Sequence, residues 1–192
     1  MNSNVKIIEE KVLSDDWYLL KKIIFEYRNK KGEWKVQSRE AHDRGNGAVI
    51  LLYNKVTKTV ILTEQFRMPT YINGNETGML IEACAGLLDK DNPEDCIRRE
   101  TEEETGYRID GVKKIFEAYM SPASVTEVLH FFIAEYTKEM KVNEGGGVDD
   151  EQENIEVLEI PFEKAMKMIE TGEIKDGKTI ILLQYAKIHG LL

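Results

Sequence analysis

The apolar residues of this chain repeat with two different spacings, which separate the predicted strands from the predicted helices. Segments rich in β-branched and aromatic residues predict strands. The expected strands are residues 17–28, 34–41, 48–53, 59–66, 79–85, 112–120, 126–136 and 155–160. Helical spacing and helix-start signals predict helices over residues 93–105, 161–171 and 178–188, and residues 70–78 predict a polar loop. Strands followed by helices on a mixed sheet predict an α/β or α+β sandwich.

The first part of the chain, residues 1–44, predicts a small antiparallel sheet ahead of the main domain. Strands 17–28 and 34–41 are joined by a turn at 30–32, and Gly45, Asn46 and Gly47 form a hinge. So short a segment is too small for a deep core of its own. We therefore expect residues 1–44 to form an appendage that packs on a neighbouring subunit, which favours a dimer. Residues 45–192 are expected to form the main domain.

Composition and charge narrow the class of protein. The 192 residues are 42% hydrophobic and 32% charged, which is ordinary for a globular protein with one sizeable domain. The net charge of −9 argues against nucleic acid bound through its backbone. Residues 1–16 are polar and mixed and predict no signal peptide, and no apolar run approaches the roughly 20 residues that cross a bilayer. Cys84 and Cys96 lack a C-x-x-C spacing, which indicates reduced thiols in a cytoplasmic protein and no zinc site.

The helix over residues 93–105 has clear boundaries and an unusual face. Asn92 is a candidate N-cap, Pro93 occupies the first helical position, and Gly106 is a typical C-terminal stop. At about 100° per residue, the face that carries the apolar residues also carries three glutamates. That face consists of Pro93, Cys96, Ile97, Glu100, Glu103 and Glu104, whereas Asp95, Arg98, Arg99 and Glu102 lie on the other side.

Carboxylates on an inward face need a positive partner. They repel one another and lose solvation when partly buried, so some take up protons unless a cation neutralises them. Mg²⁺ suits them because it prefers oxygen ligands, and Glu100 and Glu104 lie one helical turn apart. Glu103 could instead pair with Arg99, four residues back. A solvated, charge-laced helix without metal is the alternative.

The same segment resembles a known signature. Residues 99–107, R-E-T-E-E-E-T-G-Y, with Gly86 leading, resemble the Nudix box, G-x5-E-x7-R-E-U-x-E-E-x-G-U, of hydrolases that act on a nucleoside diphosphate linked to another group. The segment departs from the signature because the box is one residue shorter. In addition, Asn92 stands where the first glutamate is expected, and Thr101 replaces an aliphatic residue.

Further motifs extend the resemblance over about residues 11–188. They are R-E-A-H-D-R-G-N-G-A-V-I-L-L-Y-N, Q-F-R, A-G-L-L-D, M-S-P-A-S-V-T-E, G-G-G-V-D-D-E and T-G-E-I-K-D-G-K-T. Together they resemble the branch of ADP-ribose and GDP-mannose pyrophosphatases, bacterial GDP-mannose pyrophosphatases in particular. This resemblance implies an α/β/α sandwich with a mixed sheet and an appended N-terminal antiparallel sheet. It also implies a Mg²⁺ cofactor and a homodimer whose N-terminal sheets are exchanged.

The resemblance also implies roles for individual residues. Glu100, Glu104, Glu151 and the carbonyl of Ala85 correspond to metal ligands. Either Glu127 or Glu151 would position or deprotonate the attacking water, and both remain open. The acidic loop that contains Glu151 follows three glycines, so it is either a solvated loop or a mobile lid that brings Glu151 to the metal.

Substrate contacts follow in the same way. Arg67 would bind phosphate through its fork, unless it is an ordinary surface arginine. Trp17 stands where an aromatic ring would stack on the base. For Glu82, a structural role and a role next to the metal both stay open. The full expected set is Trp17, Ser38, Arg39, Glu40, Arg67, Ala85, Gly86, Leu87, Glu104, Glu127, Asp150, Glu151 and Lys178.

The implied activity is Mg²⁺-dependent hydrolysis of the diphosphate in a small-molecule nucleotide sugar, with no nucleic-acid or membrane partner. GDP-mannose would give GMP and mannose 1-phosphate. Two alternatives stay open, which are hydrolysis of ADP-ribose and a non-enzymatic nucleotide-sugar sensor on the same fold. The number of metal ions and the phosphorus that is attacked also stay open.

Overall fold

The computed structural model describes residues 3–88, 90–148 and 154–192 of the chain. The described residues form two compact units. Unit 1 comprises Met1–Asn46 and Tyr119–Val128, and unit 2 comprises Gly47–Ala118 and Leu129–Leu192. Asp150 and Glu151, two of the expected site residues, lie outside the described residues.

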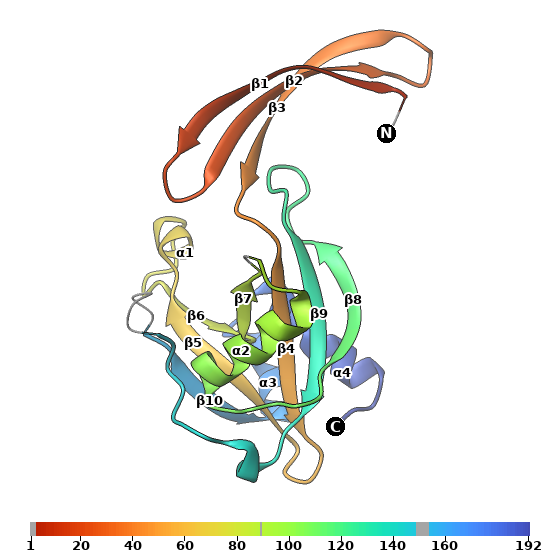
Figure 1. The fold of residues 1–192 in the computed structure, drawn as a ribbon. Helices are drawn as coiled ribbons and strands as arrows, with labels where there is room; N and C mark the ends of the chain where they lie inside the picture. Colours follow the sequence, from red (N-terminus) through yellow and green to blue (C-terminus); the bar gives the residue numbers. More distant parts are fainter. Residues whose placement is uncertain (1–2, 89, 149–153) are drawn as a thin grey trace. The chain divides into compact units, whose positions relative to one another are not determined.

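Unit 1 is built on a three-stranded antiparallel sheet (Figure 1). Its strands are β1 (Val5–Asp15), β2 (Leu19–Arg28) and β3 (Trp34–Asp43), in that order. The sequence predicted β2 and β3. The segment 119–128 joins this unit because His42 and Val125 form a parallel bridge and the His42 amide donates to the Ser124 carbonyl at 2.8 Å.

The sequence predicted no strand within residues 1–16, but the structure has β1 there. The pairing with β2 shifts register between Ile7 and Glu9 and again between Val12 and Ser14. Each shift adds one residue to β1, so its apolar residues occur as adjacent pairs rather than in alternation. The alternating pattern that identifies a strand is therefore absent from this sequence.

Unit 2 contains a seven-stranded mixed sheet in the order β10-β5-β4-β9-β8, with β6 paired to β5 and β7 paired to β4. β4 pairs parallel with β9 and antiparallel with β5. The strands are β4 (Gly47–Asn54), β5 (Thr59–Phe66), β6 (Met79–Glu82), β7 (Ala85–Leu87), β8 (Lys113–Tyr119), β9 (Val128–Glu135) and β10 (Glu156–Pro161).

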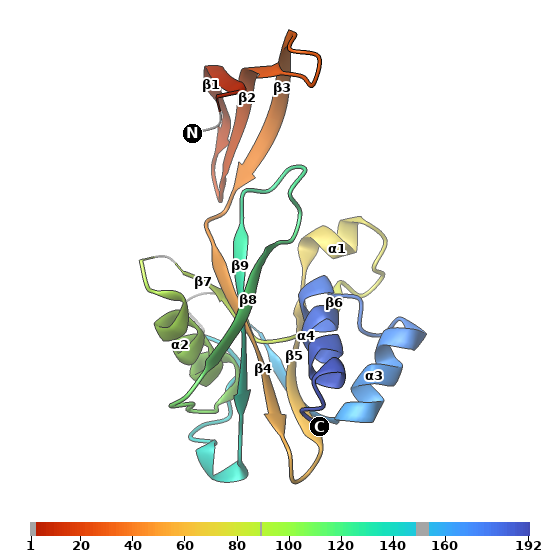
Figure 2. The ribbon, with the colours of Figure 1, turned by 90° about the vertical axis from the view of Figure 1, so that its right-hand side faces the viewer.

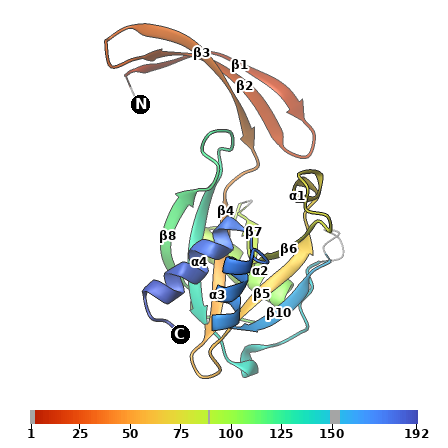
Figure 3. The same cartoon turned by 180° about the vertical axis from the view of Figure 1, so that it is seen from behind.

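Helices cover both faces of this sheet, which confirms the expected α/β/α sandwich. Helix α2 (Pro93–Thr105) lies on one face, and α3 (Phe162–Thr171) and α4 (Gly177–Ile188) lie on the other (Figures 2 and 3). A short 3-10 helix, Lys138–Met140, follows β9. Within the part of the chain that the structure describes, no helix is long and apolar enough to cross a membrane.

The hydrophobic core of unit 2 holds α2 against the central strand β4. Every residue of β4 is buried, as its continuous apolar run predicted. Alternate β4 residues, including Ile50 and Leu52, pack with Cys96 and Ile97 of α2 in one cluster. Helix α2 is thus fixed to the central strand by its apolar side chains.

Two local predictions were wrong. Residues 79–85 form two strands rather than one, because β6 pairs with β5 whereas β7 pairs with β4. Residues 83–84 carry the chain from one partner strand to the other. Part of the expected 70–78 loop is helical, because α1 spans Met68–Ile72. Pro69 lies in the first turn of this helix, where proline is favoured.

Candidate active site

Helix α2 begins and ends where the sequence predicted. The Asn92 side chain accepts hydrogen bonds from the Glu94 and Asp95 amides at 3.1 Å each, and Pro93 follows it. Gly106 ends the helix with φ 77°, in the left-handed region. Asn92 therefore caps the helix at the position where the Nudix signature has a glutamate.

Strand β7 brings the backbone directly after Ala85, the expected carbonyl ligand, against the first carboxylate. A Cβ placed on Gly86 would lie 2.1 Å from Glu100 Cδ and 2.3 Å from Glu100 Oε1. The Glu100 carboxylate therefore rests directly on the backbone that follows Ala85. The Glu100 side chain is mostly buried, so this contact lies inside the protein.

The second carboxylate lies in the same buried region. Glu104 is only 2% exposed. The pKa of the Cys84 thiol is raised well above its ordinary value, first by burial and then by the charges of Glu104 and Glu100. The thiol of Cys84, between β6 and β7, therefore lies close enough to both carboxylates for their charges to raise its pKa. Such crowding of buried acids favours a bound cation.

Glu103 has the role of an ion-pair partner. Arg99 Nη1 lies 2.9 Å from Glu103 Oε2, and Arg99 Nη2 lies 2.9 Å from Glu100 Oε1. This pairing agrees with the salt-bridge alternative left open by the sequence. The long Arg99 side chain reaches round the helix, so its phase on the helix did not reveal its contact with Glu100.

Thr101 fits the position where the Nudix signature has an aliphatic residue. It is fully buried, and its hydroxyl donates to the Ile97 carbonyl at 2.5 Å. The hydrogen bond satisfies the hydroxyl within the helix, so the departure from the signature leaves no unpaired polar group in the core.

Arg67 and Lys178 meet at one buried acid, Glu82. Arg67 Nε and Glu82 Oε2 are 2.6 Å apart, and Lys178 Nζ pairs with Glu82 Oε1. Lys178 Nζ also lies 3.0 Å from Asp176 Oδ1. The structure thus brings together two expected substrate ligands, one directly after β5 and one in α4, with Asp176, which the sequence analysis did not single out. The D-G-K sequence before a helix is the signal that could have found this N-cap.

The three glycines at 145–147 lie against the C-terminal end of α2. The Gly146 amide donates to the Glu104 carbonyl at 2.9 Å, and the Gly147 amide donates to the Glu103 carbonyl at 3.1 Å. These bonds fix the segment to the backbone that carries the candidate metal ligands. Closure of the acidic residues beyond Val148 over the metal remains a prediction.

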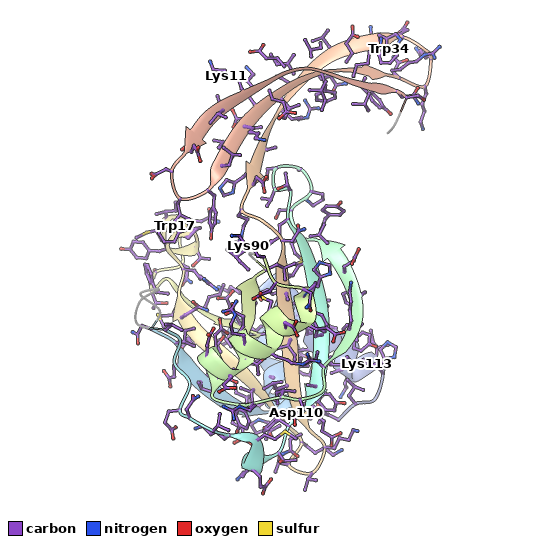
Figure 4. The ribbon with its side chains drawn as sticks, viewed as in Figure 1. Lys11, Trp17, Trp34, Lys90, Asp110 and Lys113 are labelled. Carbon is purple, nitrogen blue, oxygen red and sulfur yellow. The ribbon has the colours of Figure 1, made fainter. Side chains whose placement is uncertain are left out.

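Unit 1 carries the expected base and sugar contacts. Trp17 lies in the turn between β1 and β2 and is 84% exposed (Figure 4). Its ring meets the Tyr18 ring edge-on, with centroids 6.2 Å apart. On β3, Arg39 Nη1 donates to the Ser38 carbonyl at 2.7 Å, and Glu40 follows. An exposed indole is available to stack on a base.

Glu127, a candidate base, has a charged partner within unit 1. Arg44 Nε lies 3.5 Å from Glu127 Oε1, and the Glu127 side chain is largely buried. The Arg44 guanidinium also lies over the Tyr18 ring, 5.6 Å from its centroid. Sequence reasoning missed Arg44, although a basic residue just before the Gly45 hinge was visible.

The donor set suits a hard divalent cation. Within the described ranges, no group of three or more His, Cys, Asp or Glu side chains gathers as a metal site. The candidate donors among the described residues are the carboxylates of Glu100 and Glu104 and the backbone carbonyl of Ala85, all of which offer oxygen. Glu151, the further expected ligand, lies outside the described residues.

Comparison with known families identifies the class of protein. Residues 43–183 match the family model of the NUDIX domain, so the chain belongs to the Nudix family of hydrolases, as the signature predicted. Nudix hydrolases generally use divalent metal ions. Residues 4–42 match the family model described as the GDP-mannose pyrophosphatase NudK N-terminal domain.

Individual relatives are similar over the full chain. A GDP-mannose pyrophosphatase of Pectobacterium atrosepticum is 59% identical over 190 residues, covering 99% of this chain and 97% of the relative. Proteins of the same name from Yersinia enterocolitica and Escherichia coli O157:H7 are 58% and 55% identical over 192 residues, covering both chains completely. The similarity therefore spans both the N-terminal sheet and the Nudix domain.

Proposed function

We propose that this Nudix hydrolase cleaves GDP-mannose to GMP and mannose 1-phosphate with Mg²⁺ as its cofactor. The observation that carries the proposal is the largely buried Glu100 carboxylate against the backbone at Gly86, one helical turn before the buried Glu104. The name of the full-length relatives and the matched N-terminal domain support GDP-mannose as the substrate.

Glu100, Glu104, Glu151 and the Ala85 carbonyl would hold Mg²⁺. The ion would neutralise the phosphates and lower the pKa of an attacking water. Glu127 or Glu151 would accept the proton of that water. As the new oxygen–phosphorus bond forms and the bridging bond breaks, the Arg67 guanidinium would balance the charge on the departing phosphate.

Residues of unit 1 would select the nucleotide. Trp17 is exposed and can stack on the guanine ring, because stacking needs only an accessible aromatic face. Ser38, Arg39 and Glu40 follow one another on β3 and would contact the base and sugar. Leu87, Asp150 and Lys178 complete the proposed substrate contacts.

The test uses three glutamate-to-glutamine variants on one helix. Glu100→Gln and Glu104→Gln should each lower kcat for GDP-mannose with Mg²⁺ by roughly 100-fold or more, because a lost ligand weakens metal charge stabilisation worth several kcal/mol. Glu102→Gln is the matched control, since Glu102 pairs with the exposed Arg108 at 2.8 Å. Near-normal turnover in both Glu100→Gln and Glu104→Gln would contradict the mechanism.

A substrate panel tests the choice of nucleotide sugar. The wild-type protein should show a higher kcat/KM for GDP-mannose than for ADP-ribose, with GMP and mannose 1-phosphate as the identified products. A higher kcat/KM for ADP-ribose would reassign the substrate. Binding of nucleotide sugars without any phosphate-containing product would indicate a sensor instead of an enzyme.

We also propose a cytoplasmic homodimer in which the N-terminal sheets are exchanged. Unit 1 exposes large apolar residues on β1 and β3, including Ile7, Ile8, Val12 and Val36. Contact with the partner's sheet would remove these apolar side chains from water. The buried free thiols of Cys84 and Cys96 fit a reducing compartment.

Light scattering at micromolar concentration tests the dimer. The wild-type protein should have twice the 22.1 kDa mass of one chain, and Ile8→Asp with Val36→Asp should shift the protein to a monomer. Lys58→Ala, on the β4–β5 turn of unit 2, serves as the control and should stay dimeric. A monomeric wild-type mass would overturn this part of the proposal.

A further inference from the structure

The carboxylate of Glu82 is buried but pairs with two cations from distant parts of the chain. Glu82 ends β6 and is 3% exposed. Arg67 follows β5 and lies 2.6 Å from it, and Lys178 comes from the first turn of α4. A buried charge is costly unless it is paired, so Glu82 depends on both partners.

We propose that Glu82 is a positioning residue that orients Arg67 and Lys178 toward the substrate diphosphate. This inference rests on the proposed function. Glu82 binds Arg67 through Nε, and no ion pair of the two Nη groups occurs within the described ranges. Both Nη groups can therefore donate to phosphate oxygens. Lys178 uses two of its three donors on Glu82 and Asp176, which leaves one for phosphate.

Stability alone is a weak explanation for this cluster. Replacing a buried ion pair with well-packed apolar residues is often neutral or stabilising. The Arg67 side chain is 40% exposed, so only its inner edge is committed to Glu82. Glu82 and Asp176 balance the charges of Arg67 and Lys178, and a diphosphate would meet the outer side of this neutral cluster.

The backbone at Glu82 is held by hydrogen bonds to neighbouring strands and helices. This backbone leads directly to Ala85, whose carbonyl is the proposed metal ligand. The Thr63 hydroxyl donates to the Glu82 carbonyl at 3.3 Å, and the Ala83 amide donates to Thr179 Oγ1 at 2.6 Å. The chain then reaches Ala85 within two residues. The same short segment therefore carries both the acid that pairs with the two cations and the backbone that lies against the Glu100 carboxylate.

Steady-state kinetics test whether Glu82 acts through its two cations. Glu82→Gln should lower kcat/KM for GDP-mannose at least tenfold, mainly through a higher KM. In a background with both Arg67→Ala and Lys178→Ala the same change should cost less than threefold, because the groups that Glu82 orients are gone. Fully additive losses would overturn the proposal. Glu159→Gln, another hydrogen-bonded glutamate in unit 2, is the control and should stay within threefold of wild type.

Nitrogen-15 NMR of the folded variants gives a readout that does not require catalysis. The Arg67 Nε–H signal, assigned from its loss in Arg67→Lys, should exchange with water at least tenfold faster in Glu82→Gln. Inorganic pyrophosphate should shift this signal in the wild type and much less in the variant. Equal exchange and equal shifts would overturn the proposal. If these NMR results hold but the wild type cleaves no nucleotide sugar, only the proposed function fails.

Discussion

At the scale of single residues, the absence of a side chain decides the geometry around Glu100. Gly86 has no positive φ, so its backbone would accept any residue, yet a Cβ there would collide with the Glu100 carboxylate. Glycine is needed at this position for close approach rather than for an unusual turn. The carboxylate can thereby lie against the backbone at Gly86, the residue after Ala85.

We predict that Gly86→Ala lowers kcat by roughly 100-fold, because displacement of a catalytic group by about 1 Å has such an effect. The variant should also need more Mg²⁺ for half-maximal activity. Gly111→Ala is the matched control, since a Cβ there meets nothing within 4 Å. Equal activity and equal Mg²⁺ dependence in the two variants would contradict the role given to Gly86.

At the scale of elements, helix α2 and the segment 143–147 interlock through glycines. A Cβ on Gly106 would lie 2.1 Å from the Asn143 carbonyl oxygen, and one on Gly145 would lie 2.5 Å from the Glu104 carbonyl oxygen. Both glycines also have φ in the left-handed region. The end of α2 therefore depends on a loop that lies nearly 40 residues further along the chain.

We predict that Gly145→Ala lowers the free energy of unfolding by roughly 2–4 kcal/mol, through left-handed strain of about 1–2 kcal/mol plus the steric clash. Gly74→Ala separates these causes, because Gly74 has φ +95° but nothing within 4 Å of a Cβ. Urea unfolding of both variants measures the difference. An equal loss in both would mean that the interlock adds nothing.

At the scale of the whole molecule, a cluster of side chains around the buried Tyr136 joins four parts of unit 2. The Tyr136 hydroxyl donates to Glu159 Oε1 on β10 at 2.9 Å and lies 2.6 Å from Thr59 Oγ1 on β5. The ring of Tyr136, after β9, meets that of Tyr107, after α2, with centroids 5.0 Å apart. Burial and then Glu159 raise the pKa of Tyr107, and burial is the main cause that raises the pKa of Tyr136.

We predict that the protein loses stability above about pH 10. Both tyrosines are held protonated in the folded state, whereas unfolded tyrosines release their protons near pH 10. Stability that is fully present below that pH is therefore lost as the pH rises further. Urea midpoints at pH 8, 9.5 and 11 measure the fall, which should be smaller in Tyr136→Phe. An equal fall in both proteins would exclude Tyr136 as a cause.

The sequence by itself determined the features that depend on neighbouring residues. Helix α2 was predicted with its Asn92 cap and Gly106 stop, because capping and helical phase are set within one or two turns. The buried strand β4 and the strand β5 were predicted because a run of apolar and β-branched residues is itself a local signal. The Nudix box gave the family, since its glutamates and glycines occur at fixed spacing along one segment.

The tertiary structure alone decided what depends on partners far along the chain. The bulges of β1 follow its pairing with β2, and the split of residues 79–85 follows from strands β4 and β5. The sequence left the role of Glu82 open, and the structure shows that it pairs with Arg67 and Lys178. Burial and ion pairing are properties of assembled elements, so no local spacing could have revealed them.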